Sequence, residues 1–133
     1  MRYKRPDKKN ALSLIDAAKK RMDYTLTLEI NDDSSSTIVQ NIHESFRMLG
    51  DAILINKGID PTTHIDSISE IIKLPIKASR PLQVIDNIRT LRRNVNYYGY
   101  IPSKLEAEDV VSIAKEIFPK ACNIIKKQLA ADK

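Results

Sequence analysis

The sequence contains few of the residue types that define small disulfide-bonded or β-rich folds. Its 133 residues include one cysteine, three glycines, no tryptophan and only 5% aromatic residues. A lone cysteine cannot form a disulfide within the chain, and scarce glycines and aromatics argue against a turn-rich β fold. We therefore interpret Cys122 as a buried structural thiol, as expected in a reducing compartment.

Long hydrophobic runs are also missing from the sequence. No apolar stretch approaches the roughly 20 residues needed to cross a bilayer, and residues 52–55, for example, are bounded by Asp51 and Asn56. The first ten residues are rich in lysine and arginine, and no apolar segment that could form a signal peptide follows them. The sequence thus predicts a cytoplasmic protein without a membrane partner, whose residues 1–8 form a basic arm.

The net positive charge of the chain is modest. There are 22 lysines and arginines against 17 aspartates and glutamates, a formal charge of +5. This excess favours encounters with polyanions but gives RNA binding only weak support. A chain of this length can bury one core without metals or disulfides, so we expect residues 1–133 to form a single domain.

Apolar residues recur at steps of three and four along four long segments and one short segment, which is typical of amphipathic helices. Two capping boxes are predicted, Thr37 with Gln40 and Ser103 with Glu106. The pattern predicts an all-α fold, an up-and-down four-helix bundle with an additional short helix. The expected helices cover residues 8–29, the segment from Thr37 to Gly58, a short helix capped by Thr62 or Thr63, residues 81–99 and a long segment from Ser103 onward.

The segment from Leu91 to Tyr100 is the most unusual part of the chain, because it gathers arginines, asparagines and tyrosines at a helix end. On an ideal helix its polar residues face away from the apolar stripe, whereas Tyr98 continues that stripe. Arginines in such a segment could grip phosphate while tyrosine rings stack on bases. The alternative is a solvated helix face with tyrosines packed around its end.

This segment resembles the signature of the HEPN family, in which an arginine is followed after four residues by a histidine and then, after one more, by a tyrosine. Arg93 matches the arginine, Tyr100 the final tyrosine, and Tyr98 stands where the family has its histidine. The helix order over roughly residues 37–130 is also similar. The resemblance implies a homodimer, a minimal nucleotidyltransferase as a possible partner, and a family in which many members are metal-independent ribonucleases of the toxin type.

From this resemblance and the residue types we select candidate site residues. The catalytic candidates are Arg93 and Tyr98, and the RNA- or nucleotide-binding candidates are Arg89, Arg92, Arg93, Asn94, Tyr97 and Tyr100. Tyr98 is a poor replacement base, since only about one tyrosine in a thousand is ionised at neutral pH. Loss of general acid-base help typically costs about 10²- to 10⁴-fold in rate, so we expect a binder with weakened or absent cleavage.

Other candidate groups are given structural roles. We interpret His43 as a packed or hydrogen-bonded residue of the second helix, and His64 as part of a turn or helix start. Asp32 and Asp33 lie in a serine-rich loop with too few neighbouring ligands for a metal site. Because phosphate-binding glycine loops, zinc-ligand sets and common hydrolase motifs are absent, no metal and no cofactor are expected.

Two further functions are compatible with the sequence. The chain could be a non-enzymatic partner subunit of a minimal nucleotidyltransferase, in which case the resemblance makes Tyr100 a possible target of adenylylation. It could also be a helical dimerisation module with no ligand.

Overall fold

The computed structural model describes residues 5–62 and 66–131, and these residues form five helices packed against one another. This confirms the predicted all-α bundle. The helices are α1 (Lys8–Thr25), α2 (Ser35–Asn56), α3 (Ser67–Ile72), α4 (Val84–Tyr98) and α5 (Lys104–Ala131).

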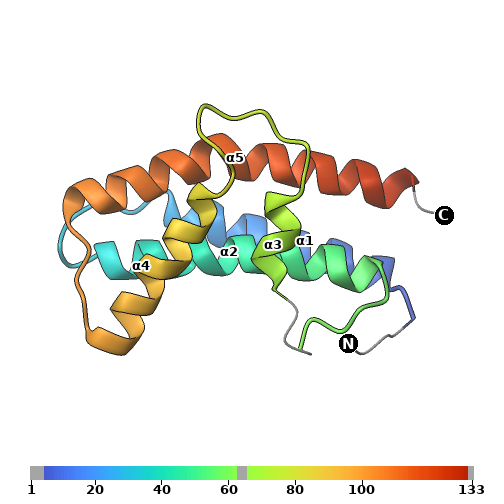
Figure 1. Ribbon diagram of the computed structural model, residues 1–133, viewed down its shortest axis with the longest axis horizontal. Coiled ribbons are helices and arrows are strands. Elements are labelled where there is room, and N and C mark those ends of the chain that lie inside the picture. Colours follow the sequence, from blue (N-terminus) through green and yellow to red (C-terminus); the bar gives the residue numbers. More distant parts are fainter. Residues whose placement is uncertain (1–4, 63–65, 132–133) are drawn as a thin grey trace.

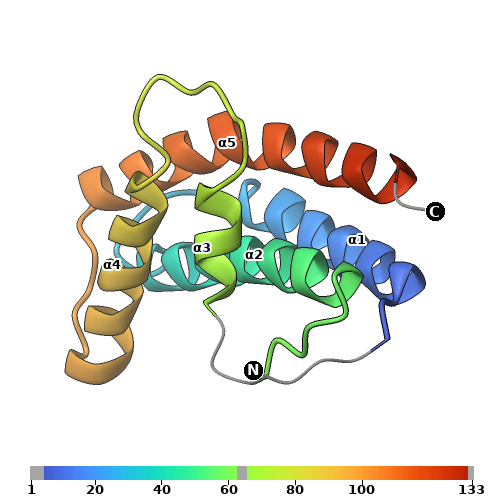
Figure 2. The same cartoon turned by 45° about the vertical axis from the view of Figure 1, so that its right-hand side comes forward.

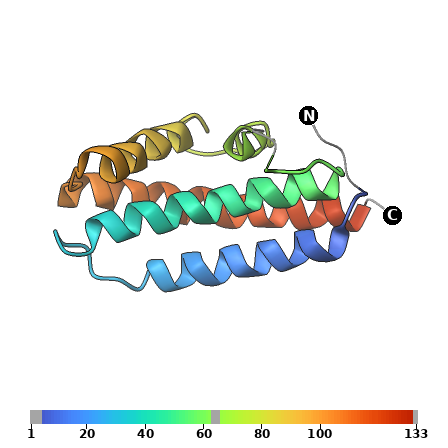
Figure 3. The same cartoon turned by 90° about the horizontal axis from the view of Figure 1, so that it is seen from below.

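The long helices α1, α2 and α5 lie lengthwise beside one another, and α4 crosses them obliquely (Figures 1 and 2). Seen from below, α1 lies on one side of α2 while α3 and α4 lie together on its other side (Figure 3). Because α2 contacts each of the other four helices, it is the central element of the bundle.

The core is built from the apolar stripes that the sequence predicts. Phe46 of α2 is fully buried, and its ring meets the ring of Phe118 of α5 edge to face with centroids 5.5 Å apart. Ile15 and Met22 of α1 and Ile117 of α5 are similarly enclosed. No helix within the described ranges combines the length and apolar character that a membrane span requires.

Several predicted helix ends are correct. Ser103 and Glu106 form the expected capping box, since Glu106 N–H donates to Ser103 Oγ at 3.1 Å and Ser103 N–H donates to Glu106 Oε1 at 2.9 Å. Gly99 ends α4 in the left-handed region, with φ of 65°, where glycine carries no steric penalty.

Other predicted ends are wrong, and polar side chains near them make contacts that the local pattern does not show. The first helix ends at Thr25 instead of residue 29, and the hydroxyl of Thr27 donates to Tyr24 O. The second helix starts at Ser35, and Gln40 hydrogen-bonds to Asn96 of α4 instead of forming a capping box.

The third helix is capped by Asp66, whose side chain accepts hydrogen bonds from Ile68 N–H and Ser69 N–H. Thr62, which was one predicted cap, instead donates its hydroxyl to Asp60. The other predicted cap, Thr63, lies outside the described residues.

The docking of α3 on α2 depends on a close backbone approach at Gly50. A Cβ atom at this position would lie 2.0 Å from the carbonyl oxygen of Ser67, far inside contact distance. The Ser67 hydroxyl donates a hydrogen bond to Asp51, the residue that follows Gly50. There is therefore no room for a side chain at this position, and glycine is required even though it destabilises a helix interior.

We predict that Gly50→Ala lowers the free energy of unfolding by about 1–3 kcal/mol, because the added methyl group forces α3 away from α2 and this outweighs the gain in helix propensity. Urea unfolding followed by circular dichroism measures the change. The matched control is Gly99→Ala, which adds its methyl group to open space and costs only the backbone strain of a positive φ, about 1 kcal/mol. Wild-type stability in Gly50→Ala would contradict the steric argument.

Candidate functional site

A hollow of about 330 Å³ opens where α2, α3 and α4 meet, and we call it the arginine cleft. Its walls come from segments that are far apart in the sequence but adjacent around α2. Its lining residues are His43, Arg47, Asp51, Pro61, Asp66, Ser67, Ile68, Arg89, Arg92, Arg93 and Tyr97.

Arg47 holds the α2 wall of the cleft in place. Its guanidinium group donates to Glu44, with Nε 3.0 Å from Oε1, and forms an ion pair with the nearly buried Asp51. The hydrogen bond from Arg47 lowers the pKa of Glu44, so this carboxylate stays ionised well below neutral pH. Asp51 also accepts a hydrogen bond from the Ser67 hydroxyl, so this carboxylate, held by Arg47, connects α2 to α3.

Arg89 plays the equivalent role for α4. It forms an ion pair with Asp66, the N-cap of α3, and a longer one with Asp86, at 3.4 Å. Burial alone would raise the pKa of Asp66, but the hydrogen bonds from Arg89 and Ser69 outweigh it and lower the pKa below its ordinary value. Arg89 thus connects α4 to α3 through Nη2, which makes both ion pairs.

Arg92 and Arg93 are different, because neither side chain forms a hydrogen bond or an ion pair with any of the described residues. Arg92 is half-buried and Arg93 is exposed. Each guanidinium offers five N–H donors in a planar fork that suits the oxygens of a phosphate or carboxylate. Tyr97, 73% exposed, stands one helical turn further along the same wall of the cleft.

His43 also lines the cleft, from α2. Its side chain is only 6% exposed, and neither ring nitrogen has a hydrogen-bond partner among the residues that the structure describes. Burial, and secondarily the charge of Arg92, lowers the pKa of His43 from 6.5 to about 4, so the ring is neutral at physiological pH. A buried polar group without a partner is costly, which marks this histidine as unusual.

The structure brings together four of the predicted site residues, Arg89, Arg92, Arg93 and Tyr97, around the arginine cleft. Asn94 instead lines a separate hollow of about 290 Å³ beside Glu106 and α5. The hydroxyl of Tyr100 donates to Glu106, and this hydrogen bond raises the pKa of Tyr100.

Tyr98 requires a correction. The sequence places it on the apolar stripe of α4, but its side chain is 80% exposed and does not line the arginine cleft. The reason is that the last turn of α4 extends past the helices that cover its apolar side, so Val95 is only half-buried and Tyr98 is uncovered. Because α4 remains helical as far as Tyr98, this side chain and that of Arg93 lie on different faces of the helix.

The contribution of α2 to the site was not predicted from the sequence. His43, Arg47 and Asp51 are spaced four residues apart, and such residues fall on one face of a helix. In a helix that is otherwise largely apolar, this polar stripe was the available signal. Its position against α3 and α4 could not be read from the spacing alone.

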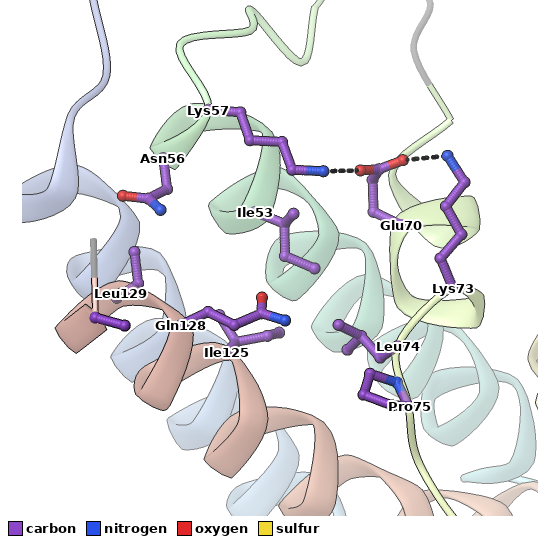
Figure 4. Close-up of a pocket in the computed structure, with 11 residues that line it drawn as sticks. Ile53, Asn56, Lys57, Glu70, Lys73, Leu74, Pro75, Ile125, Gln128 and Leu129 are labelled. Atoms are coloured by element: carbon purple, nitrogen blue, oxygen red, sulfur yellow. Dashed lines mark hydrogen bonds and ion pairs between the residues drawn. The ribbon is translucent and has the colours of Figure 1, made fainter.

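A second hollow, of about 420 Å³, lies between the C-terminal part of α2, α3 and α5 (Figure 4). Its floor is apolar, and Glu70 at its rim accepts from Lys57 at 3.0 Å and from Lys73 at 2.9 Å. Because Glu70 pairs with both lysines beside it, this hollow offers fewer uncommitted charged donors than the arginine cleft.

Within residues 5–62 and 66–131, no three acidic, histidine or cysteine side chains are grouped so that they could hold a metal ion. His64 lies outside the described residues. No protein-family model, no curated protein and no solved structure matches this chain.

The low pKa of His43 makes stability depend on pH. Between pH 6.5 and about 4 the unfolded chain binds a proton at this position that the folded chain does not, so stability falls as the pH falls through this range. We predict that the loss reaches about 3 kcal/mol in the wild type. In His43→Leu this contribution is missing, and urea unfolding at several pH values measures the difference.

The comparison isolates His43 because every other titrating group, including the second histidine, is the same in both proteins. The carboxylates of Glu44 and Asp66, whose pKa values are lowered in the folded protein, stabilise the fold at neutral pH. This stabilisation is lost only when the pH falls to the pKa range of free carboxylic acids, near or below about 4.5. Parallel stability curves for the two proteins between pH 6.5 and 4.5 would show that His43 titrates normally.

Proposed function

We propose that this chain is an RNA- or nucleotide-binding protein that holds phosphate groups in the arginine cleft. The observation that carries the proposal is the contrast between engaged and free arginines. Arg47 and Arg89 are committed to carboxylates, whereas Arg92 and Arg93 keep their donors available at the mouth of the same hollow. A guanidinium group forms strong hydrogen bonds when two of its N–H donors bind one phosphate, because both groups are charged.

Tyr97 supports a nucleic-acid ligand over a simple anion. Its exposed ring lies on the same helix wall, at residue i+4 from Arg93 and i+5 from Arg92. Aromatic rings that stack on unpaired bases contribute about 1–3 kcal/mol per base, independently of sequence. Arginines and an exposed tyrosine on one wall therefore suit a single strand whose phosphates enter the cleft.

We also propose that the resemblance to the HEPN family reflects this binding function. A HEPN-like protein with Tyr98 in the histidine position would retain the arginine and lose the proton-transfer group. Tyr98 does not line the arginine cleft, which adds to the reasons for proposing binding with little or no cleavage.

We predict that Arg92→Ala and Arg93→Ala each weaken the binding of a single-stranded RNA oligonucleotide by roughly tenfold, because each removes one phosphate contact. Each substitution should also reduce the slope of log affinity against log salt concentration by about one. Fluorescence anisotropy at several salt concentrations measures both effects.

The control is Arg80→Ala, which removes a cation from outside the arginine cleft. Arg80 pairs with Asp109 at 3.1 Å, and its loss should leave both affinity and salt slope close to the wild type. If the Arg92→Ala/Arg93→Ala double variant binds RNA as the wild type does, the arginine cleft is not the binding site.

A second candidate function, association with another protein, is favoured by one specific observation. Large apolar side chains are exposed at the corner between α4 and α5, where Tyr98 is 80%, Ile101 60% and Leu105 79% exposed. Neighbouring exposed apolar groups of this size mark interaction surfaces. We propose that a second copy of the chain covers this corner in a homodimer, with a minimal nucleotidyltransferase as the alternative partner.

We predict that Leu105→Glu converts the homodimer to a monomer without unfolding it, since Leu105 is exposed and an acidic residue suits the first turn of α5. Light scattering coupled to size-exclusion chromatography measures the mass. The control is Leu12→Glu on α1, which is also exposed but lies outside the corner. A wild-type protein that stays monomeric at high concentration rejects the homodimer, and a complex with the nucleotidyltransferase that Leu105→Glu abolishes identifies the other partner.

A further inference from the structure

The most unusual group in the molecule is the unpartnered imidazole of His43. Polar side chains on buried helix faces normally find hydrogen-bond partners, and its neighbours on the same stripe do so, Arg47 with Glu44 and Asp51 with Ser67. Both nitrogens of His43 lack a partner among the described residues. Hydrogen bonding within the bundle therefore gives no reason for a histidine at this position.

The surroundings of His43 identify the ligand that would satisfy it. The residue lines the arginine cleft together with Arg92 and Arg93, the two arginines that keep free donors. Among the charged groups, Arg92 acts on the imidazole most strongly. A group with several acceptor oxygens could accept hydrogen bonds from the guanidinium and the imidazole at the same time, and a phosphate has this geometry.

We infer that His43 is a direct ligand of the phosphate bound in the arginine cleft, donating a ring N–H to a phosphate oxygen beside Arg92. This inference rests on the proposed function and adds to it a residue from a different helix. It requires a side-chain rearrangement, because the ring nitrogens are enclosed in the free protein. Arginine side chains such as Arg92 change rotamer quickly, so this rearrangement is accessible.

Binding should also change the protonation of His43. In the free protein the charged groups that act on the ring are Arg47 and Glu44 of its own helix and Arg89 and Arg92 of α4, while Asp51 of α2, Asp66 at the start of α3 and Arg93 of α4 line the same cleft. The three arginines oppose a positive charge on the ring, and Glu44 favours it. A phosphate in contact with the ring adds a negative charge, which raises the pKa of His43.

The sign of the pH dependence follows from this change. When the ligand raises the pKa of His43 above its free value of about 4, binding takes up a proton at any pH between the two values. By reciprocal linkage, affinity then increases as the pH falls through that range, by up to about tenfold per pH unit. Above about pH 5, where the carboxylates of the cleft are ionised, a cleft that used only arginines would bind with an affinity that does not change with pH.

The test uses the full chain and an oligouridylate with hydroxyl groups at both ends, because neither its bases nor its phosphodiesters titrate between about pH 5 and 8. The NMR titration of His43 is measured with and without saturating ligand. The sequence contains only one other histidine, so the variant His64→Gln assigns the signal. We expect a midpoint near 4 in the free protein and a midpoint at least one pH unit higher in the complex.

Two variants test the contact by affinity. His43→Gln keeps a hydrogen-bond donor that does not titrate, so it should bind within a few-fold of the wild type at neutral pH and lose the increase at low pH. His43→Leu has no donor and should bind roughly tenfold more weakly. Circular dichroism establishes that both variants are folded, and the NMR measurement on the wild type does not depend on either.

Each outcome supports or overturns a specific statement. If the wild type binds no RNA at any pH and low salt, both the proposed function and this inference are wrong. If it binds RNA but the titration midpoint of His43 is the same in the free and bound proteins, or His43→Leu binds as the wild type does at every pH, only the role of His43 is wrong.

Discussion

The rest of the structure depends on the burial of α2. This helix contacts all four others, so almost every direction around its axis is occupied by a neighbour. An apolar residue on such a helix gains from burial, but each buried polar residue needs a hydrogen-bond partner, from its own helix, another helix or a ligand. Asp51 meets this requirement through Ser67 of α3 and Arg47 of its own helix, and Ser45 through the carbonyl of Asn41. His43 does not meet it within the bundle.

The ionic contacts around the arginine cleft form two separate groups with different consequences. Glu44 and Asp51 surround Arg47, while Asp66 and Asp86 surround Arg89. Partly exposed pairs of this kind contribute little to stability, about 0–1 kcal/mol each. Only Arg89–Asp66 joins two elements, α4 and the start of α3, while the other pairs lie within α2 or within α4. Because these four carboxylates pair with Arg47 and Arg89, they do not pair with Arg92 and Arg93, whose N–H donors remain free.

Much of the fold could be predicted from periodicity and caps. The stripes of α1, α2, α4 and α5, the Ser103 capping box and the stop at Gly99 are all set within a few residues of sequence, and the structure confirms them. The wrong ends have an identifiable cause. Gln40 and Thr62 fit local capping patterns but find partners at Asn96 and Asp60 instead. A local sequence pattern does not show whether such a side chain will cap its helix or bind another group in the folded protein.

The candidate site was only partly predictable, for the same reason. The sequence places the arginines and Tyr97 on the polar face of α4, and the structure does gather them at one cleft. It also places Tyr98 with the apolar residues, because helical periodicity carries no information about where the covering helices stop. The contribution of His43 was visible only as a polar residue four positions before Arg47, with nothing to show which helices it faces.

By itself the sequence determined the helical class of this protein, the stripes that form its core and the basic, tyrosine-rich end of α4, because these follow from side-chain chemistry at helical spacing. The tertiary structure decided which arginines remain free and where His43 lies. Those properties depend on contacts between α2, α3 and α4, whose residues are separated by 16 to 56 positions along the chain and meet only after the bundle has packed.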